Sequence, residues 1–313
     1  MLTAATPGEE GARLYQSFGV QIPDLAPKRA ANEGQGPFSR LVIDGVMIVD
    51  GLGSPPRGPV SIVVEGDKIT SIHGRAPKPV ENEERLEAAG MTVLPGFIEA
   101  HAHAGSPGEG IAGPVVPPEY VFKLWLAHGI TTVGDVGSTM GLEWTVNHAR
   151  RSESSDIVAP RIIPFSMFPG SVVTDAKSAR DWVRSVKKSG AKGVKLRGAT
   201  KETLSAVYEE TAKLGMGTAS HHDQNGVYHM NVLDSARLGL QSMEHWYGLP
   251  EAMFTDRTIQ DYPPSYNYSN EQWRFGEAGN LGKQAAAPGT KTWNATIEEL
   301  SSLDYAGANL YDL

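Results

Sequence analysis

From about residue 95 onward, short apolar runs alternate with amphipathic stretches at a nearly regular spacing. The runs begin near residues 97, 131, 161, 193, 218 and 241, roughly 25–35 residues apart. Short apolar runs predict buried strands, and the amphipathic stretches between them predict helices. Strands that alternate with helices at this spacing form a parallel sheet with crossover helices. The pattern therefore predicts an α/β fold, either an open sheet or most of a (β/α)8 barrel.

The helices between these runs carry signals at their ends. We expect helices over residues 119–128, 141–151, 176–189, 201–214 and 230–238. For the third helix, Thr174 is the expected N-cap and Gly190 is the glycine just past its end. The fourth helix is bounded in the same way by Thr200 and Gly215. These boundaries support the alternating pattern.

The chain before residue 95 follows a different pattern and predicts two further regions. Residues 41–94 contain short β-branched runs separated by glycine and proline turns, including a hairpin of 60–64 with 69–72 around Gly66. We expect a small β-sandwich module there. Residues 1–40 lack a sustained period and predict an extended N-terminal arm, with a disordered tail as the alternative. Residues 95–313 would then form the barrel domain.

Composition limits the chemistry and the partners. The 313 residues include 28 Lys and Arg, 36 Asp and Glu, and no cysteine, which gives a formal net charge of −8. Without cysteine there are no disulfides, thiolate metal ligands or cysteine nucleophiles. The acidic balance argues against nucleic acid as a partner, and no apolar run reaches the ~18 residues that span a bilayer. We expect a cytoplasmic protein with a small-molecule substrate; a removed export signal and a homo-oligomer stay open.

Residues suited to metal binding or catalysis lie at the ends of the predicted strands. His101 and His103 end the first strand, and the two-residue period of a strand turns both rings to the same side. Lys195, His221 and His245 end the fourth, fifth and sixth strands. In a barrel these positions surround one mouth, where active sites are built. Their convergence predicts a shared site.

Each of these residues also has an ordinary interpretation. A lone His-x-His pair is common, a lysine at a strand end is often a solvated charge, and His245 alone could be a core histidine. Five such residues at strand ends favour function. His222 should face the opposite side and is predicted to be structural. The histidines to which we assign no role are His73, His128, His148 and His229.

Four sequence motifs resemble those of the amidohydrolase superfamily. Residues 94–103, LPGFIEAHAH, follow the β module, and 129–133, 193–195 and 242–245 resemble the second, fourth and sixth strand motifs. Their order and spacing are most similar to the prolidase-like and imidazolonepropionase-related branch. The resemblance covers residues 41 to about 245. It implies a TIM-type (β/α)8 barrel with a binuclear metal centre.

The resemblance also implies roles for the candidate residues. His101 and His103 would bind the more buried of two divalent ions, and His221 and His245 would bind the second. Lys195 would be carboxylated, and its carbamate would bridge both ions as part of the catalytic centre. Lysine suits this reaction because its pKa shifts readily in a partly buried site beside cations. Imidazole and oxygen donors suit zinc, with manganese or cobalt as alternatives.

The implied activity is metal-dependent hydrolysis of carbon–nitrogen bonds, peptide bonds included. A metal-bound hydroxide would attack the carbonyl of an amide, a cyclic amide or a dipeptide-like substrate. Tyr228 follows the fifth strand and is a candidate for binding a substrate oxygen. Hydrolysis of esters or phosphotriesters at the same site is one alternative. A catalytically inactive fragment or metal-binding protein is another.

The end of the chain departs from the family pattern. The family uses an aspartate after the eighth strand, and no matching segment follows His245. Asp304 and Asp312 are acidic candidates, although a predicted helix at 294–306 and a chain end are poor places for that role. A seventh strand could begin at 308–311. We therefore expect a barrel that is incomplete at its C-terminus, part of a longer enzyme.

Two loops complete the prediction. Residues 105–110 are glycine-rich without a phosphate-binding lysine and predict a flexible first loop. Residues 246–293 predict a long loop insertion that contains nine aromatic residues. These rings would form a lid over the site or pack the loop onto the barrel. They are Trp246, Tyr247, Phe254, Tyr262, Tyr266, Tyr268, Trp273, Phe275 and Trp293.

Overall fold

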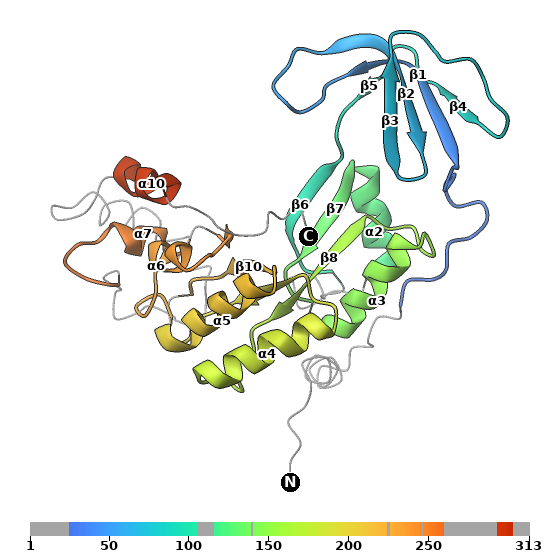
Figure 1. Cartoon of the computed structure of the whole chain (residues 1–313). Helices are drawn as coiled ribbons and strands as arrows, with labels where there is room; N and C mark the ends of the chain where they lie inside the picture. The colour runs from blue at the N-terminus through green and yellow to red at the C-terminus, as the bar shows by residue number, and fades with distance from the viewer. Residues whose placement is uncertain are drawn as a thin grey trace.

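The structure is a computed structural model of the chain, and it describes residues 25–104, 116–138, 140–223, 226–245, 247–259 and 293–302. These residues form a small N-terminal sheet and a larger curled sheet that helices cover (Figure 1). Several predictions lie outside the described residues: the arm over 1–24, the loop at 105–110, most of the long loop, Asp304, Asp312 and the strand at 308–311.

The N-terminal sheet has five strands. They are β1 (Arg40–Ile48), β2 (Arg57–Glu65), β3 (Lys68–His73), β4 (Glu84–Glu87) and β5 (Thr92–Val93). The order is β3-β2-β1-β4, and β5 pairs with β1. The predicted hairpin is present as β2 and β3, which turn at Gly66 with φ +60°. The described residues form one sheet here rather than the two packed sheets of a sandwich.

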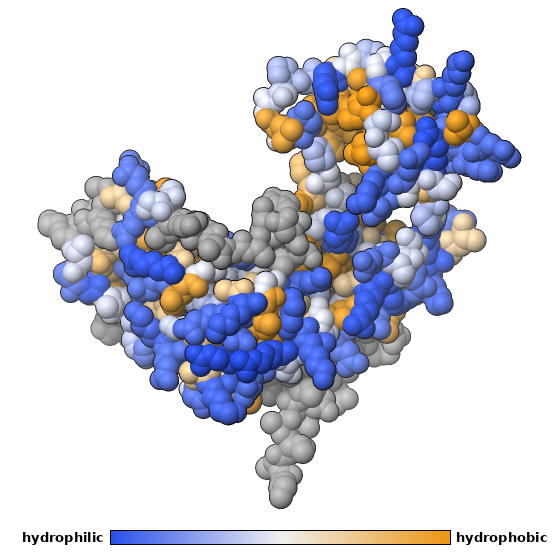
Figure 2. Space-filling view, viewed as in Figure 1, coloured by the Kyte–Doolittle hydropathy of each residue, from blue (hydrophilic) through white to orange (hydrophobic). Residues whose placement is uncertain are grey.

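This small sheet has its own core and an apolar surface. Val46, Ile48, Ile62 and Ala88 are buried together. Large apolar side chains also remain exposed, among them Ile69 on β3, and Figure 2 shows hydrophobic residues gathered over this part of the molecule.

The larger sheet has six parallel strands in sequential order. They are β6 (Phe97–Ala102), β7 (Ile130–Asp135), β8 (Arg161–Met167), β9 (Gly193–Leu196), β10 (Gly217–Ser220) and β11 (Ser242–Met243). Each strand pairs in parallel with the next along the chain. The predicted α/β fold is therefore confirmed. The sheet curls as part of a barrel would, with helices on its outer side (Figure 1).

The helices follow the predicted order. They are α2 (Pro118–Ala127), α3 (Leu142–Glu153), α4 (Ala176–Lys188), α5 (Lys201–Lys213), α6 (Val232–Arg237), α7 (Leu249–Met253) and α10 (Trp293–Ser302). The predicted cap of α4 is wrong by one residue. Asp175 rather than Thr174 is the N-cap, because its carboxylate accepts a 2.7 Å hydrogen bond from the N–H of Ser178. Thr200 caps α5 as expected.

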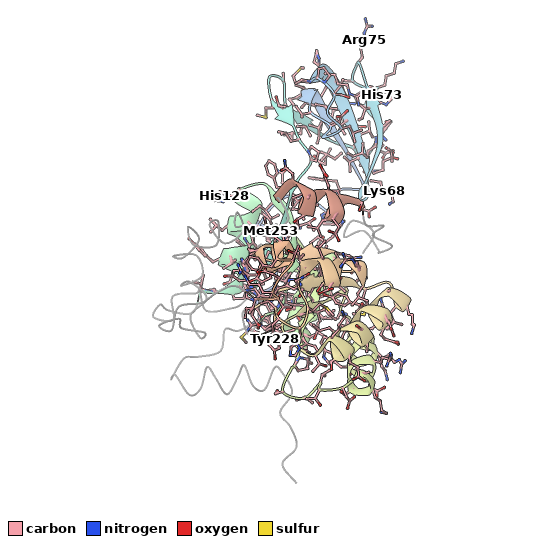
Figure 3. All side chains as sticks on the ribbon, turned by 90° about the vertical axis from the view of Figure 1, so that its left-hand side faces the viewer. Lys68, His73, Arg75, His128, Tyr228 and Met253 are labelled. Atoms are coloured by element: carbon pink, nitrogen blue, oxygen red, sulfur yellow. The ribbon has the colours of Figure 1, made fainter. Side chains whose placement is uncertain are left out.

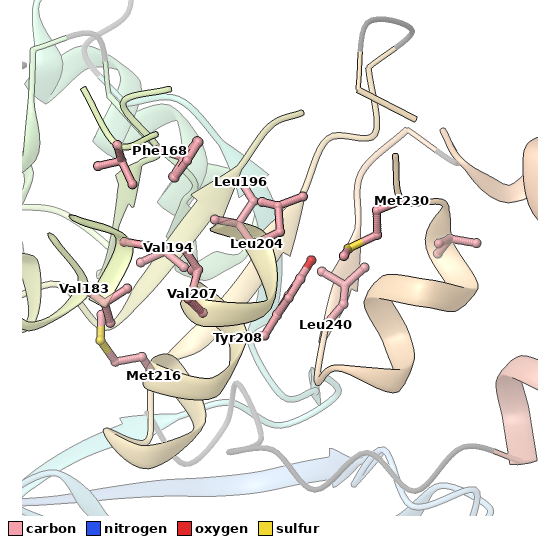
Figure 4. Packing of buried hydrophobic residues seen from close by; sticks show 14 of the residues in the cluster. Phe168, Val183, Val194, Leu196, Leu204, Val207, Tyr208, Met216, Met230 and Leu240 are labelled. Atoms are coloured by element: carbon pink, nitrogen blue, oxygen red, sulfur yellow. The ribbon is translucent and has the colours of Figure 1, made fainter. Parts of the chain in front are cut away.

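The main core lies between the outer side of the sheet and the helices. Val194 and Leu196 of β9 pack there with Val183 of α4 and with Leu204 and Val207 of α5 (Figure 4). Because side chains alternate along a strand, positions 193 and 195 of β9 face the inside of the curled sheet. A Cβ on Gly193 would lie 2.3 Å from Cε1 of Phe165, so glycine is required beside that ring. Lys195 therefore points into the curl.

The segment before β1 packs along the barrel-like body. The N–H of Ala26 donates to Nε2 of His148 at 3.0 Å, and the N–H of Arg29 donates to the carbonyl of Asp156 at 2.8 Å. Nδ1 of His148 donates to the carbonyl of Trp144, so this buried histidine has a structural role. The described part of the predicted arm thus lies against α3 and the turn after it.

Candidate metal centre

The four predicted histidines lie next to one another at the ends of three strands. The ring centroids of His101 and His103 are 5.1 Å apart, and those of His101 and His245 are 4.7 Å apart. His221 lies 5.2 Å from His245 on the same measure. The carboxyl ends of the parallel strands β6, β10 and β11 lie on the same side of the curled sheet (Figure 1). Residues that are far apart in the sequence therefore form one cluster.

His101 and His103 face each other through their Nε2 atoms, which are 3.1 Å apart. Nδ1 of His103 lies 2.8 Å from the carbonyl oxygen of Gly137. A carbonyl oxygen can only accept, so Nδ1 of His103 carries the proton. Nε2 of His103 then presents a lone pair towards His101.

The same reasoning applies to His101, whose Nδ1 contacts Oε2 of Glu244. Burial alone would raise the pKa of Glu244. The hydrogen bond from His101 and the positive charge of Lys195 outweigh burial and lower this pKa to about 2. An ionised carboxylate accepts the Nδ1–H of His101, which leaves the lone pair on Nε2.

When both rings are neutral, two lone pairs therefore face each other across the 3.1 Å between the Nε2 atoms. They repel unless a proton or a metal cation lies between them. Two nitrogens that each bind a tetrahedral zinc ion at about 2.0–2.1 Å are about 3.3 Å apart. A separation of 3.1 Å between two imidazole nitrogens is thus compatible with one shared divalent ion, a role that stays a prediction. Within the described ranges, no group of three or more histidine or carboxylate side chains has the spacing of a complete site.

Lys195 lies on the inner side of β9 and is linked to His101 through Glu244. Its side chain is 4% exposed, and Nζ is 3.6 Å from Oε2 of Glu244. Lys195 pairs in the sheet with Met167 on one side and Ala219 on the other. Oε2 of Glu244 thus contacts Nδ1 of His101 and also lies 3.6 Å from Nζ of Lys195.

His221 and His245 share an aromatic neighbour. Their rings lie 4.8 Å and 5.7 Å from the ring of Tyr247, which is 2% exposed. Tyr247 and Phe254 are buried, so these two rings of the predicted loop pack against the body. His221 is itself buried, whereas His103 and His245 are exposed. The cluster is thus open to solvent on one side.

A buried carboxyl group supports the His103 end of the cluster. Asp135, the last residue of β7, accepts hydrogen bonds from the hydroxyl of Thr145 at 2.8 Å and from the N–H groups of Gly137 and Ala104. Burial raises the pKa of Asp135 to about 7, against the opposing effect of these three donors. Asp135 thus ties the residue after His103 to the residue whose carbonyl orients His103.

Comparisons with known proteins find partial relatives. No family model matches the chain. It is 28% identical to adenine deaminase 2 of Rhizobium johnstonii over 171 residues, which cover 52% of this chain and 27% of the relative. It is 24% identical to a dihydroorotase of Staphylococcus epidermidis over 205 residues, 63% of this chain and 45% of the relative. The chain thus spans less than half the length of these curated relatives.

A solved Xaa-Pro dipeptidase with bound methionine has a similar fold. The TM-score is 0.51 at 20% identity, over 85% of this chain and 74% of the other. These matches support the amidohydrolase superfamily that the motifs suggest. At 20% identity the likeness to the dipeptidase shows the fold alone, so the prolidase-like branch suggested by the motifs stays a prediction. Within the superfamily, the relatives carry different reaction names, so their substrates do not transfer to this chain.

Tyr228 and His222 contact residues outside the cluster of four histidines. Tyr228 is 49% exposed and stacks on His229 at 3.8 Å (it is labelled in Figure 3), and the contacts of the described residues do not join it to the four histidines. Nε2 of His222 is 2.9 Å from Oγ of Ser235, in line with a structural role. None of the described helices is long and apolar enough to cross a membrane.

The sequence interpretation missed three participants: Glu244, Asp135 and Gly137. Glu244 was assigned to a strand on which it would face away from His245. The chain instead turns at His245, whose φ is +55°, and both side chains reach His101. Asp135 lies in an otherwise apolar run, and the contribution of Gly137 is a backbone carbonyl. The acidic residue inside a predicted buried strand was the available signal for Asp135.

Proposed function

We propose that the chain is a metal-dependent hydrolase of carbon–nitrogen bonds in amides, cyclic amides or dipeptide-like small molecules. The observation that carries this proposal is the 3.1 Å approach of Nε2 of His101 to Nε2 of His103, in two rings whose Nδ1 atoms each contact an acceptor oxygen. Similarity to the amidohydrolase superfamily supports the reaction class.

We assign the metal ligands as follows. His101 and His103 would hold one divalent ion, His221 and His245 a second, and a carboxylated Lys195 would contribute an oxygen to each. Nitrogen and oxygen donors without thiolate suit zinc, and manganese or cobalt accept the same set. When bound, such ions supply a water nucleophile at neutral pH and polarise the oxygen of a substrate carbonyl.

The chain's own residues would prepare the site for this chemistry. Glu244 and the carbonyl of Gly137 hold the Nδ1 protons of His101 and His103, so that both rings offer Nε2. The exposed rings of His103 and His245 leave the cluster open to a small molecule. A net charge of −8 favours small substrates over nucleic acid. We also place the protein in the cytoplasm.

The test combines metal analysis with an activity screen. The protein and its His101→Ala and His103→Ala variants are loaded with zinc, freed of excess metal, analysed for bound metal, and screened against N-acyl amino acids, dipeptides, cyclic amides and esters. We expect the unmutated protein to retain metal and to cleave at least one C–N substrate. Each variant should lose metal and activity together, because one imidazole leaves the ion under-coordinated.

His73→Ala is the matched control. His73, which is labelled in Figure 3, ends β3 in the small sheet and contacts Ser71. The His73→Ala variant should keep both metal and activity. Hydrolysis of esters alone would overturn the assigned bond type. Metal binding without turnover of any substrate would make the chain a binding protein, and a His103→Ala variant with full metal and activity would overturn the assigned site.

A further inference from the structure

The carboxylate of Glu244 contacts side chains from three strands of the large sheet. Oε2 accepts from Nδ1 of His101 and lies 3.6 Å from Nζ of Lys195. Oε1 accepts a 2.7 Å hydrogen bond from the hydroxyl of Ser242. The side chain is only 4% exposed. Both oxygens are therefore held, and the carboxylate has a defined position between β6, β9 and β11.

The backbone fixes this position as well. The N–H of Glu244 donates to the carbonyl of Ser220 at 3.0 Å, which continues the pairing of β10 with β11 by one residue. The next residue, His245, has a φ of +55°, in the left-handed region that non-glycine residues rarely adopt. This turn breaks the strand alternation, so that two consecutive side chains, Glu244 and His245, both lie beside His101.

We propose that Glu244 is a positioning residue for the metal site. Its carboxylate holds the proton of His101 on Nδ1 and thereby directs the Nε2 lone pair at His103. This role rests on the proposed function, since it matters for catalysis only if a cation binds between the two rings. A carboxylate behind a ligating imidazole fixes the ring orientation and the tautomer and raises the basicity of the ligand.

The two histidines of the pair are oriented by different kinds of group. Behind His103 stands a neutral backbone carbonyl, that of Gly137, which side-chain substitution cannot remove. His101 is oriented by a side-chain carboxylate, that of Glu244. The assignment therefore predicts that one side-chain change, at Glu244, releases one histidine of the pair while the other keeps its tautomer.

The alternative is that Glu244 only balances the buried charge of Lys195. That role would affect folding stability but would leave the tautomer of His101 unchanged. Two measurements separate the roles: zinc affinity by competition with a chelator, and the His101 tautomer in the metal-free protein by long-range ¹H–¹⁵N NMR. The variants are Glu244→Ala, which removes the acceptor, and Glu244→Gln, which keeps an amide oxygen that can accept from Nδ1.

Glu210→Gln is the matched control. Glu210 is also 4% exposed and also ion-paired, with Nε of Arg184 at 2.7 Å, but it lies on α5 outside the cluster. We expect Glu244→Ala to weaken zinc binding by roughly 10–100-fold. It should also shift His101 towards the Nε2–H tautomer, while His103 keeps Nδ1–H. In Glu244→Gln, His101 should retain the Nδ1–H tautomer, and the loss of zinc affinity should be smaller than in Glu244→Ala. Glu210→Gln should have the zinc affinity and the His101 tautomer of the unmutated protein.

Two results would overturn the role of Glu244: unchanged zinc affinity in Glu244→Ala, or an Nδ1–H tautomer of His101 that persists in Glu244→Ala. If Glu244→Ala does not fold, Glu244→Met, which also lacks an acceptor, takes its place, and an Nδ1–H tautomer of His101 that persists in it would overturn the role equally. A failure of the unmutated protein to bind zinc would instead contradict the proposed function. The tautomer in the metal-free protein would still decide the role of Glu244.

Discussion

Nζ of Lys195 lies 3.6 Å from Oε2 of Glu244, and each side chain is only 4% exposed. The two charges are thus held out of water, where each offsets the other. Carboxylation would replace the ammonium by an anion beside a second anion. Two negative charges at this distance in a buried site need positive charge nearby.

We therefore predict that carboxylation of Lys195 depends on bound metal. The neutral amine of Lys195 adds carbon dioxide and releases a proton, and the divalent ions offset the resulting charge. With ¹³C-labelled bicarbonate, a carbamate signal should appear in the zinc-loaded protein and be absent after chelation. A carbamate signal of equal strength in the metal-free protein would contradict this dependence.

Replacement of Lys195 gives a second prediction. Lys195→Ala should lose activity, and formate or acetate with excess metal should restore part of it, because a short acid places two oxygens where the carbamate stood. The variant should also unfold at lower temperature, since removal of one partner of a buried ion pair costs about 3–5 kcal/mol. Full activity of Lys195→Ala without added acid would show that Lys195 has no bridging role.

Gly137 gives a third prediction, because its carbonyl orients His103. Its φ is +122°, and an added Cβ would lie 2.1 Å from Cγ of Met167. Gly137→Ala should therefore shift this carbonyl and weaken zinc binding as well as lower the stability by about 1–3 kcal/mol. Gly239 has a similar φ of +105° with no atom near its added Cβ. Gly239→Ala should lose stability but keep the zinc affinity of the unmutated protein.

The raised pKa of Asp135 gives a fourth prediction. This carboxyl ionises near pH 3.8 when exposed and near pH 7 in the fold, so the folded state binds the extra proton between these values. The free energy of unfolding should therefore fall as the pH rises through this window, by up to about 1.4 kcal/mol per pH unit. Asp135→Asn has no carboxyl group at this position and therefore lacks this contribution to the pH dependence of stability.

The check is thermal or urea unfolding of the chelated protein at pH 5 and pH 8. The stability of Asp135→Asn relative to the unmutated protein should increase from the lower to the higher pH. Comparison of the two proteins at each pH cancels the contributions of other titrating groups. A difference that stays constant between the two values would mean that Asp135 ionises at its ordinary pKa.

The sequence was sufficient to predict the sheet and the assembly of the four histidines. Apolar runs and helix periods predicted the six parallel strands, and parallel strands that share an edge bring His101, His221 and His245 together. These features depend on local patterns repeated along the chain. A barrel with its remaining strands, and the ligand roles of the histidines, stay predictions.

The supporting groups could not be predicted in the same way. Glu244 reaches the cluster only because β11 ends at Met243 and the chain turns at His245, which a two-residue period cannot reveal. The orientation of His103 depends on a backbone carbonyl, which carries no sequence signal. At α4, Thr174 and Asp175 are both good caps, and only the geometry selects Asp175. Tyr228 was assigned from chain proximity to β10, its ring lies 3.8 Å from that of His229, and its role in binding substrate stays a prediction.

The facing lone pairs of His101 and His103 lead to one decisive measurement: anomalous X-ray scattering at the zinc edge from crystals of the zinc-loaded protein. We predict a peak between the two rings, about 2.0–2.1 Å from each Nε2 atom. The contradictory result is a pair of rings that stays in direct hydrogen-bond contact, with a proton between the Nε2 atoms and no anomalous peak there.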